Sequence, residues 1–198
     1  MKNRVITISR EFGSGGRTIG RKVAEKLGIP CYDSELIQEL EKETGFAADY
    51  VKEAGEYAPG GFLASALSNR MFGPTNEDIL WAHQYKVITA LAEKGPCVIV
   101  GRCADEILRQ AGIDSLNVFI HADQLHRAVY ASELTGITNA TELQKLLKRV
   151  DSGRQVYYNH YTGRKWGDPH NYHMSLDSGA LGYDLCAKFI VEAVQAEN

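Results

Sequence analysis

A strand, a glycine-rich loop and a helix follow one another at the start of the chain, and this order constrains the fold more than any other feature. The apolar run Val5–Ser9 predicts a strand, and apolar residues recur at helical spacing after Thr18. Between them lies the sequence Gly13-Ser14-Gly15-Gly16-Arg17-Thr18. Such a loop turns several backbone N–H groups toward one anion, and the positive end of the helix adds to the attraction. Residues Gly13 to Thr18 are therefore predicted to bind phosphate.

The loop matches the general phosphate-loop pattern G-x-x-x-x-G-K-[ST] only in part. Gly16 and Thr18 occupy their places, whereas Glu11 stands at the first glycine position and Arg17 replaces the lysine. The alternative is a glycine-rich turn that binds no ligand. The strand before the loop and the helix after it favour the phosphate site, because the motif requires that context.

Short apolar runs and helical patterns alternate along the rest of the chain. Strands are predicted at residues 30–32, 97–100, 116–120 and 172–176, and helices at 34–44, 79–93, 104–111, 124–134, 141–158 and 181–195. Nearly continuous apolar character is typical of parallel strands that are covered on both faces. The alternation therefore indicates an α/β fold in which helices cover both faces of a central parallel sheet, with ligands at the carboxyl ends of the strands.

Residues 45–78 depart from this alternation. The segment is rich in Gly, Ala, Asn and Pro, and it contains Pro59-Gly60-Gly61 and Gly73-Pro74. A stretch of this length without regular structure is usually functional or disordered, which favours a flap over the substrate. Length suggests that residues 1–198 form one domain carrying this insertion.

Charge, hydropathy and cysteine spacing argue against some binding partners and cellular compartments. The net charge is −3 and no dense Lys/Arg stripe occurs, so nucleic acid is not expected as a partner. No apolar run approaches the length of a membrane span, and the run at Val5–Ile8 is too short for a secretory signal. The four cysteines show neither zinc nor disulfide spacing. We therefore expect a cytoplasmic protein without a membrane partner; its oligomeric state is left open.

Polar side chains follow two further predicted strands at their carboxyl ends. Asp33 comes after the second strand, where it could instead act as a helix N-terminal acid or cap before Ser34. Arg102 comes after the third, where it could be an ordinary surface arginine. An arginine fork just past a buried strand is well placed to hold a phosphate in bidentate fashion.

Farther along, Asp151 and Arg154 stand three residues apart in a helical pattern and share one face. On spacing alone they could be a surface ion pair. Arg149 lies five residues before Arg154 and points elsewhere on a regular helix. The aromatic residues Tyr157, Tyr158, Tyr161 and Trp166 could stack on a base or form part of the core.

Together these residues resemble the cytidylate kinase-like family, within the P-loop nucleoside monophosphate kinases. The resemblance covers most of the chain. It is carried by Ile6–Arg17, Tyr32-Asp33, Val98–Arg102 with Ala104-Asp105, and the segment from Tyr157 through Trp166-Gly167-Asp168-Pro169 to Tyr172. Glu11 and Arg17, which depart from the general phosphate-loop pattern, resemble what this branch carries.

The resemblance implies a three-layer P-loop fold with a helical flap at 45–78 on the acceptor side and a lid at about 124–165. It implies that Gly13, Ser14, Gly15, Gly16, Arg17 and Thr18 hold the phosphates of ATP, with the Thr18 hydroxyl on Mg²⁺. Asp33 and Arg102 would hold the acceptor nucleotide. By the same resemblance Arg17 and Arg154, with Arg149 less securely matched, would neutralise the transferring phosphate, and Asp151 would lie near the acceptor sugar.

The expected activity is transfer of the γ-phosphoryl group of Mg·ATP to a nucleoside monophosphate, with CMP or dCMP the first choice. Residues 45–78 do not align with the base-reading insertion of cytidylate kinases, so the base stays open. Two alternatives remain. One is a P-loop kinase for another small-molecule acceptor, and the other is a nucleotide-binding module with little catalysis, because arginine and lysine are not interchangeable at a phosphate site.

Overall fold

The computed structural model describes residues 5–33, residues 36, 38, 40, 42, 44–49 and 51, and residues 75–196. Its described strands form one parallel sheet in the order β2-β3-β1-β4-β5. The strands are β1 (Val5–Arg10), β2 (Cys31–Tyr32), β3 (Val98–Val100), β4 (Ser115–His121) and β5 (Met174–Asp177). All five fall where apolar runs predicted them, so the expectation of a parallel α/β sheet is confirmed.

Helices lie between these strands and after the last of them. They are α1 (Gly16–Leu27), α5 (Asn76–Glu93), α6 (Ala104–Gln110), α7 (Gln124–Thr135), α8 (Ala140–Thr162), α9 (Ser178–Leu181) and α10 (Tyr183–Gln195), with a 3₁₀ turn at Pro169–Asn171. The predicted helix at 181–195 corresponds to α10 and begins two residues early, and the short α9 was not predicted. Gly182, with φ +75°, separates them.

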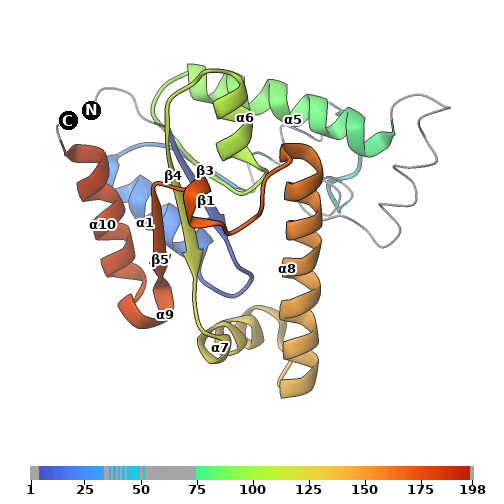
Figure 1. The fold of residues 1–198 in the computed structure, drawn as a ribbon, viewed down its shortest axis with the longest axis vertical. Coiled ribbons are helices and arrows are strands. Elements are labelled where there is room, and N and C mark those ends of the chain that lie inside the picture. Colours follow the sequence, from blue (N-terminus) through green and yellow to red (C-terminus); the bar gives the residue numbers. More distant parts are fainter. Residues whose placement is uncertain are drawn as a thin grey trace.

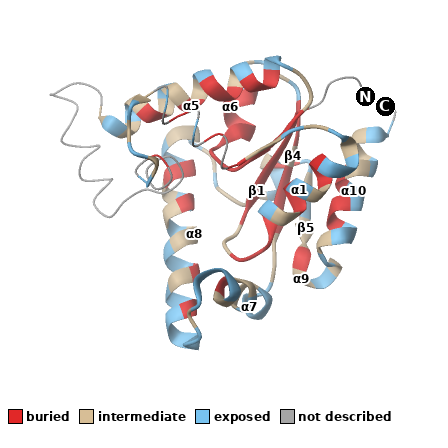
Figure 2. Cartoon of the chain, turned by 180° about the vertical axis from the view of Figure 1, so that it is seen from behind, coloured by how far each residue is buried: buried red, intermediate tan, exposed pale blue. Residues whose placement is uncertain are grey.

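Helices cover both faces of the sheet and create two cores (Figures 1 and 2). Alternate residues of β1 serve the two faces: Ile6 and Ile8 pack with α1 and α10, whereas Val5 packs with α5 and α6. The three central strands β3, β1 and β4 are buried along almost their whole length because helices cover both faces, whereas the edge strands β2 and β5 are partly exposed. The predicted three-layer arrangement is confirmed.

The topology places β1 at the centre of the sheet, between β3 and β4. The loop after β1 therefore lies among the carboxyl ends of its neighbours, where parallel sheets bind ligands. Helix α7 follows β4 directly and lies beyond its carboxyl end. Helix α8 runs alongside the sheet (Figure 1).

These two helices occupy the region predicted as a lid. Asp123 caps the start of α7 and Asn139 caps the start of α8, and glycines in the left-handed conformation end both helices. Of the segment predicted as a flap, residues 50 and 52–74 lie outside the described residues, so the flap remains a prediction. In the described parts of the chain, no helix is both long and apolar enough to cross a membrane.

Candidate active site at the glycine loop

Glycine is required in the loop because groups from other elements approach its backbone too closely for a Cβ atom. Gly13 and Gly15 have φ values of +82° and +75°, a region that side chains disfavour. A Cβ atom on Gly13 would lie 2.5 Å from the Arg127 carbonyl oxygen, and one on Gly15 would lie 2.4 Å from the Tyr183 ring. The loop is thus held between α7 and the start of α10.

Ser14 stabilises the loop through its own side chain. Its buried hydroxyl lies 2.9 Å from the Glu11 carbonyl oxygen and 3.1 Å from that of Ile120. The Ser178 hydroxyl donates to the Ser14 carbonyl oxygen at 2.6 Å. Ser14 therefore shapes the loop, and its role in holding phosphate stays a prediction.

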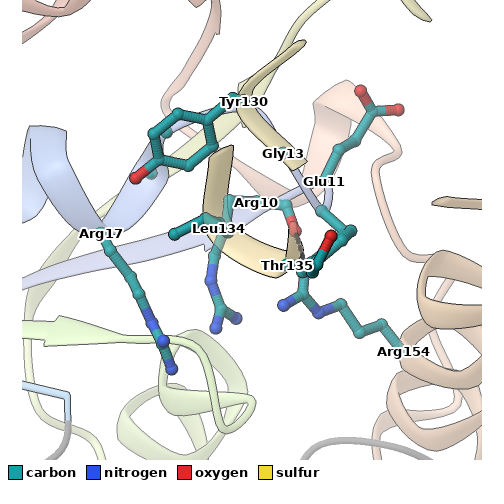
Figure 3. Close-up of a pocket in the computed structure, with 11 residues that line it drawn as sticks. Arg10, Glu11, Gly13, Arg17, Tyr130, Leu134, Thr135 and Arg154 are labelled. Atoms are coloured by element: carbon teal, nitrogen blue, oxygen red, sulfur yellow. Dashed lines mark hydrogen bonds between the residues drawn. The ribbon is translucent and has the colours of Figure 1, made fainter. Parts of the chain in front are cut away.

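A cavity of about 270 Å³ opens beside the loop (Figure 3). Three arginines, Arg10, Arg17 and Arg154, line it together with loop residues and the α7 residues Tyr130, Leu134 and Thr135. Glu11 is the one acidic residue among those that line it. Its carboxylate points away from the three guanidinium groups in Figure 3 and pairs with Arg127 at 3.2 Å. The cavity is positively charged and suits an anion.

Arg17 and Asp33, both predicted as site residues, meet in the structure. The Arg17 Nε atom lies 3.1 Å and 2.9 Å from the two carboxylate oxygens of Asp33. The Arg17 side chain is 49% exposed, whereas Asp33 is buried. This ion pair joins the loop to the end of β2, the edge of the sheet where the acceptor is expected.

Helix α8 contacts the loop through Asp151 and Arg154. The Asp151 carboxylate accepts a hydrogen bond from the Phe12 backbone N–H at 2.8 Å and pairs with Arg127. The Arg154 guanidinium is 7% exposed, donates to the Arg10 carbonyl oxygen at 2.9 Å and lies over the Phe12 ring. The two residues are therefore packed against the loop, which excludes a solvated surface pair.

Two roles predicted for residues of α8, those of Asp151 and Arg149, are left untested by these contacts. The Asp151 carboxylate lies against the loop, so a contact with the acceptor sugar stays a prediction. Arg149 is exposed, and its catalytic role also stays a prediction. Arg127 of α7, whose Nε donates to the Phe12 carbonyl oxygen at 2.8 Å, was missed because no local pattern marks it. The signal available was its place in the first turns of a helix that directly follows β4.

A second, narrow cavity lies on the other side of Arg10 and Arg154, at the end of β3. It is lined by Ser9, Arg10, Gly101, Arg102, Cys103, Arg154, Tyr157, Tyr158 and Trp166. Arg102 has φ +62° and is 4% exposed, so a surface arginine is excluded. One of its terminal nitrogens donates to the Val51 carbonyl oxygen at 2.6 Å and to the Gln84 side-chain oxygen at 3.2 Å.

The aromatic residues near the end of α8 combine the two predicted roles. Tyr157 is buried and accepts a hydrogen bond from Gln84 at 2.9 Å, and Tyr161 stacks on Trp81 with ring centroids 4.4 Å apart. These contacts belong to the core. Tyr157, Tyr158 and Trp166 also line the second cavity, where their rings can contact a ligand.

A third cavity, of about 510 Å³, lies between α7 and the turn from β5 to α10. Gly13 lines it and also lines the first cavity, so the two adjoin at the loop. Its walls include Tyr130 and Tyr183, whose rings meet edge to face at 6.0 Å, and the apolar side chains of Leu125 and Val129. An aromatic base fits this chemistry. Sequence reasoning missed the cavity because its walls are far apart in the chain.

Asp105 is a buried carboxyl that sequence reasoning did not single out as a site residue. It lies in the first turn of α6 and accepts a hydrogen bond from the Tyr158 hydroxyl at 2.7 Å. Burial raises the pKa of Asp105 from 3.8 to about 6, although that hydrogen bond lowers it in part. The carboxyl is thus half protonated near pH 6.

We expect Asp105→Asn to flatten the dependence of stability on pH. A carboxyl whose pKa is raised by folding binds its proton more tightly in the folded state, so the free energy of unfolding falls as pH rises from about 4 to above 6. At pH 7.5 the variant should be more stable by up to roughly 3 kcal/mol. Urea unfolding at pH 5 and pH 7.5 measures this, with the exposed Asp114→Asn as a control. An equal pH dependence in wild type and Asp105→Asn would contradict it.

The predicted magnesium ligand, Thr18, lies in the first turn of α1, and its hydroxyl is 3.1 Å from the Tyr130 hydroxyl. The described residues contain no cluster of three His, Cys, Asp or Glu side chains that could hold a metal. Mg²⁺ is commonly held by one or two protein oxygens together with substrate phosphates and water. A single hydroxyl beside a phosphate loop fits that mode of binding.

Comparison with known proteins agrees with this geometry. The model of the cytidylate kinase-like family matches residues 5–180. A cytidylate kinase from Pyrococcus horikoshii is 25% identical over 158 residues, which are 79% of this chain and 71% of that protein.

Among solved structures, an uncharacterized protein from Eubacterium ventriosum is 27% identical, with a TM-score of 0.73 over 98% of this chain and 99% of that chain. Shikimate kinase from Bacteroides thetaiotaomicron is 13% identical, with a TM-score of 0.57 over 98% and 99% of the two chains, and shares the fold. Together the comparisons support a kinase of the P-loop type. With 176 of its 198 residues matched by the family model, the chain belongs to the cytidylate kinase-like family.

Proposed function

We propose that this protein transfers the γ-phosphoryl group of Mg·ATP to a nucleoside monophosphate, with CMP or dCMP as the favoured acceptor. The observation that carries the proposal is the cavity beside the glycine loop, which is lined by three arginines and adjoins the arginine-lined second cavity. Two anionic substrates can meet there. Family membership supports the acceptor class.

The donor binds at the loop. Backbone N–H groups from Gly13 to Thr18 and the N-terminal end of α1 hold its phosphates, and Arg17 takes the place of the usual lysine. The adenine occupies the third cavity, whose walls include Tyr130 and Tyr183. That cavity adjoins the loop at Gly13, so one nucleotide can reach both.

The acceptor binds at the ends of β2 and β3. Arg102 and Arg154, which line the second cavity, hold its phosphate, and Asp33 holds another part of the nucleotide. Arg102 has the charge and the fixed orientation this requires, because Val51 and Gln84 position its guanidinium. A bidentate arginine is well suited to a phosphate.

Catalysis by these residues is a matter of position and charge. Phosphoryl transfer requires little covalent chemistry of a protein, so fixed cations and N–H donors supply most of the acceleration. Asp151 and Arg127 hold the loop in its binding shape through Phe12. Thr18 would hold Mg²⁺, which neutralises phosphate charge when bound. Helices α7 and α8 cover the loop and limit the access of water.

The direct test is ADP release from Mg·ATP in the presence of CMP, dCMP, UMP, AMP and GMP, with shikimate as a non-nucleotide acceptor. We expect CMP or dCMP to give a kcat/KM at least about tenfold above the purine nucleotides, a difference of about 1.4 kcal/mol in transition-state binding. Turnover with shikimate alone would keep the P-loop kinase and replace the acceptor. Tight ATP binding with no acceptor-dependent turnover would favour the nucleotide-binding module.

A further inference from the structure

Arg10 is a charged residue at the end of the central strand, and it received no role from the sequence. It is the last residue of β1, it pairs in register with Ile120 of β4, and it is 5% exposed. Burying a charged group is costly unless an opposite charge or hydrogen bonds compensate. This buried charge lies at the carboxyl end of the central strand, where parallel sheets bind their ligands.

The stem of Arg10 is fixed by the loop. A Cβ atom on Gly16 would lie 2.6 Å from the Arg10 Cβ atom and 2.8 Å from its Cγ atom, so the loop backbone rests directly on this side chain. Its carbonyl oxygen accepts the hydrogen bond from Arg154 at 2.9 Å. Arg10 is therefore held from both sides, by the donor loop and by α8.

The head of Arg10 is directed into the site. In Figure 3 its guanidinium lies between those of Arg17 and Arg154, and all three residues line the first cavity. Arg10 and Arg154 also line the second cavity, which Arg102 borders. Cations gathered around one cavity repel each other, and an anion placed among them removes the repulsion.

We propose that Arg10 is a catalytic residue that contacts the phosphoryl group as it passes from donor to acceptor. The proposal rests on the proposed function. The bond between the γ-phosphorus and the oxygen that bridges to the β-phosphate breaks, and a bond from that phosphorus to a phosphate oxygen of the acceptor forms. Arg10 stays protonated throughout and transfers no proton. Arg10 lines both cavities, so its positive charge lies close to the phosphoryl group while that group passes from the donor to the acceptor.

The test compares the affinities of two nucleotides that differ in the γ-phosphate. Calorimetry in the presence of Mg²⁺ measures binding of ADP and of AMPPNP, a non-hydrolysable ATP analogue. Arg10→Met keeps the stem that supports Gly16 and removes the charge. We expect it to weaken AMPPNP binding at least about tenfold and to leave ADP binding within about twofold, because ADP lacks the group that Arg10 contacts. With an acceptor, kcat should fall at least about a hundredfold.

Two further variants support the comparison. Arg10→Lys keeps both stem and charge and so guards against a failure to fold; we expect it to weaken AMPPNP about fivefold and ADP not at all, because lysine cannot form the bidentate contact. Arg21→Met makes the same substitution at an exposed arginine of α1 and should change neither affinity. Circular dichroism verifies that each variant is folded.

Equal losses for ADP and AMPPNP would make Arg10 a structural support of the loop and overturn the proposal, as would unchanged affinities in Arg10→Met and Arg10→Lys. The proposed function fails differently. If wild type turns over none of the nucleoside monophosphates yet shows the selective AMPPNP effect, the acceptor is wrong and the role of Arg10 stands. If wild type turns over CMP and Arg10→Met does so equally well, the function stands and the role of Arg10 is refuted.

Discussion

Arg154→Met is expected to lower kcat/KM by at least about a hundredfold while the protein stays folded. Arg154 lines both cavities, so its charge is available to the phosphates of donor and acceptor together. A hundredfold loss corresponds to about 2.7 kcal/mol of transition-state stabilisation. Methionine preserves much of the packing against Phe12, and loss of the hydrogen bond to Arg10 should cost only about 1 kcal/mol of stability.

Steady-state kinetics and thermal unfolding of the same variant separate the two effects. A lid residue that acts mainly in the transition state lowers kcat and kcat/KM together, whereas a residue that only binds substrate raises KM. Arg149→Met is the comparison on the same helix, and it tests the weaker prediction that Arg149 also contributes. A large drop in Tm with unaltered kinetics would make Arg154 structural and remove α8 from the catalytic assignment.

Arg17→Met is expected to lower kcat at least about a hundredfold, because Arg17 stands where P-loop kinases carry the lysine that neutralises the transferring phosphate. The Nε edge of Arg17 faces Asp33, while the side chain lines the first cavity. The substitution also leaves Asp33 without this cation. Asp33→Asn is therefore the necessary comparison, since it removes the carboxylate and keeps Arg17.

Kinetics of the two variants distinguish a direct role from an indirect one. If Arg17 contacts phosphate directly, Arg17→Met reduces kcat far more than Asp33→Asn does, and Arg17→Lys restores part of the activity. Equal losses in Arg17→Met and Asp33→Asn would mean that Arg17 acts by positioning Asp33. Near-full turnover in Arg17→Met would assign the role of the loop lysine to another cation.

The sequence predicted those parts of the molecule that depend on local chemistry. Apolar runs located all five described strands, because strands covered on both faces are mostly apolar. The glycine loop was recognisable in the sequence because its positions require glycine. Two of them have left-handed backbone conformations, and neighbouring groups leave no room for a Cβ atom. The helical pattern placed α7 within one residue at either end, whereas it ended α8 at residue 158 and the helix continues to Thr162.

Other parts depend on contacts between distant segments and carry no local pattern. The third cavity needs Tyr130 and Tyr183 on helices that meet only in the folded chain. The direction of Arg10 is fixed by Gly16 and α8, and periodicity alone does not give it because the residue ends its strand. Asp151 and Arg154 looked like a surface ion pair by spacing, and the loop they cover is about 140 residues away in sequence.

The position of β1 in the sheet also governs when the site can exist during synthesis. β1 precedes the other described strands in the sequence, and its neighbours β3 and β4 come after residue 97. The Ser14 carbonyl oxygen is bonded by Ser178, and the Gly15 backbone is covered by the ring of Tyr183. A growing chain therefore carries its glycine loop without these partners until Ser178 and Tyr183 have been synthesised, so the loop gains its final contacts long after its own residues are made.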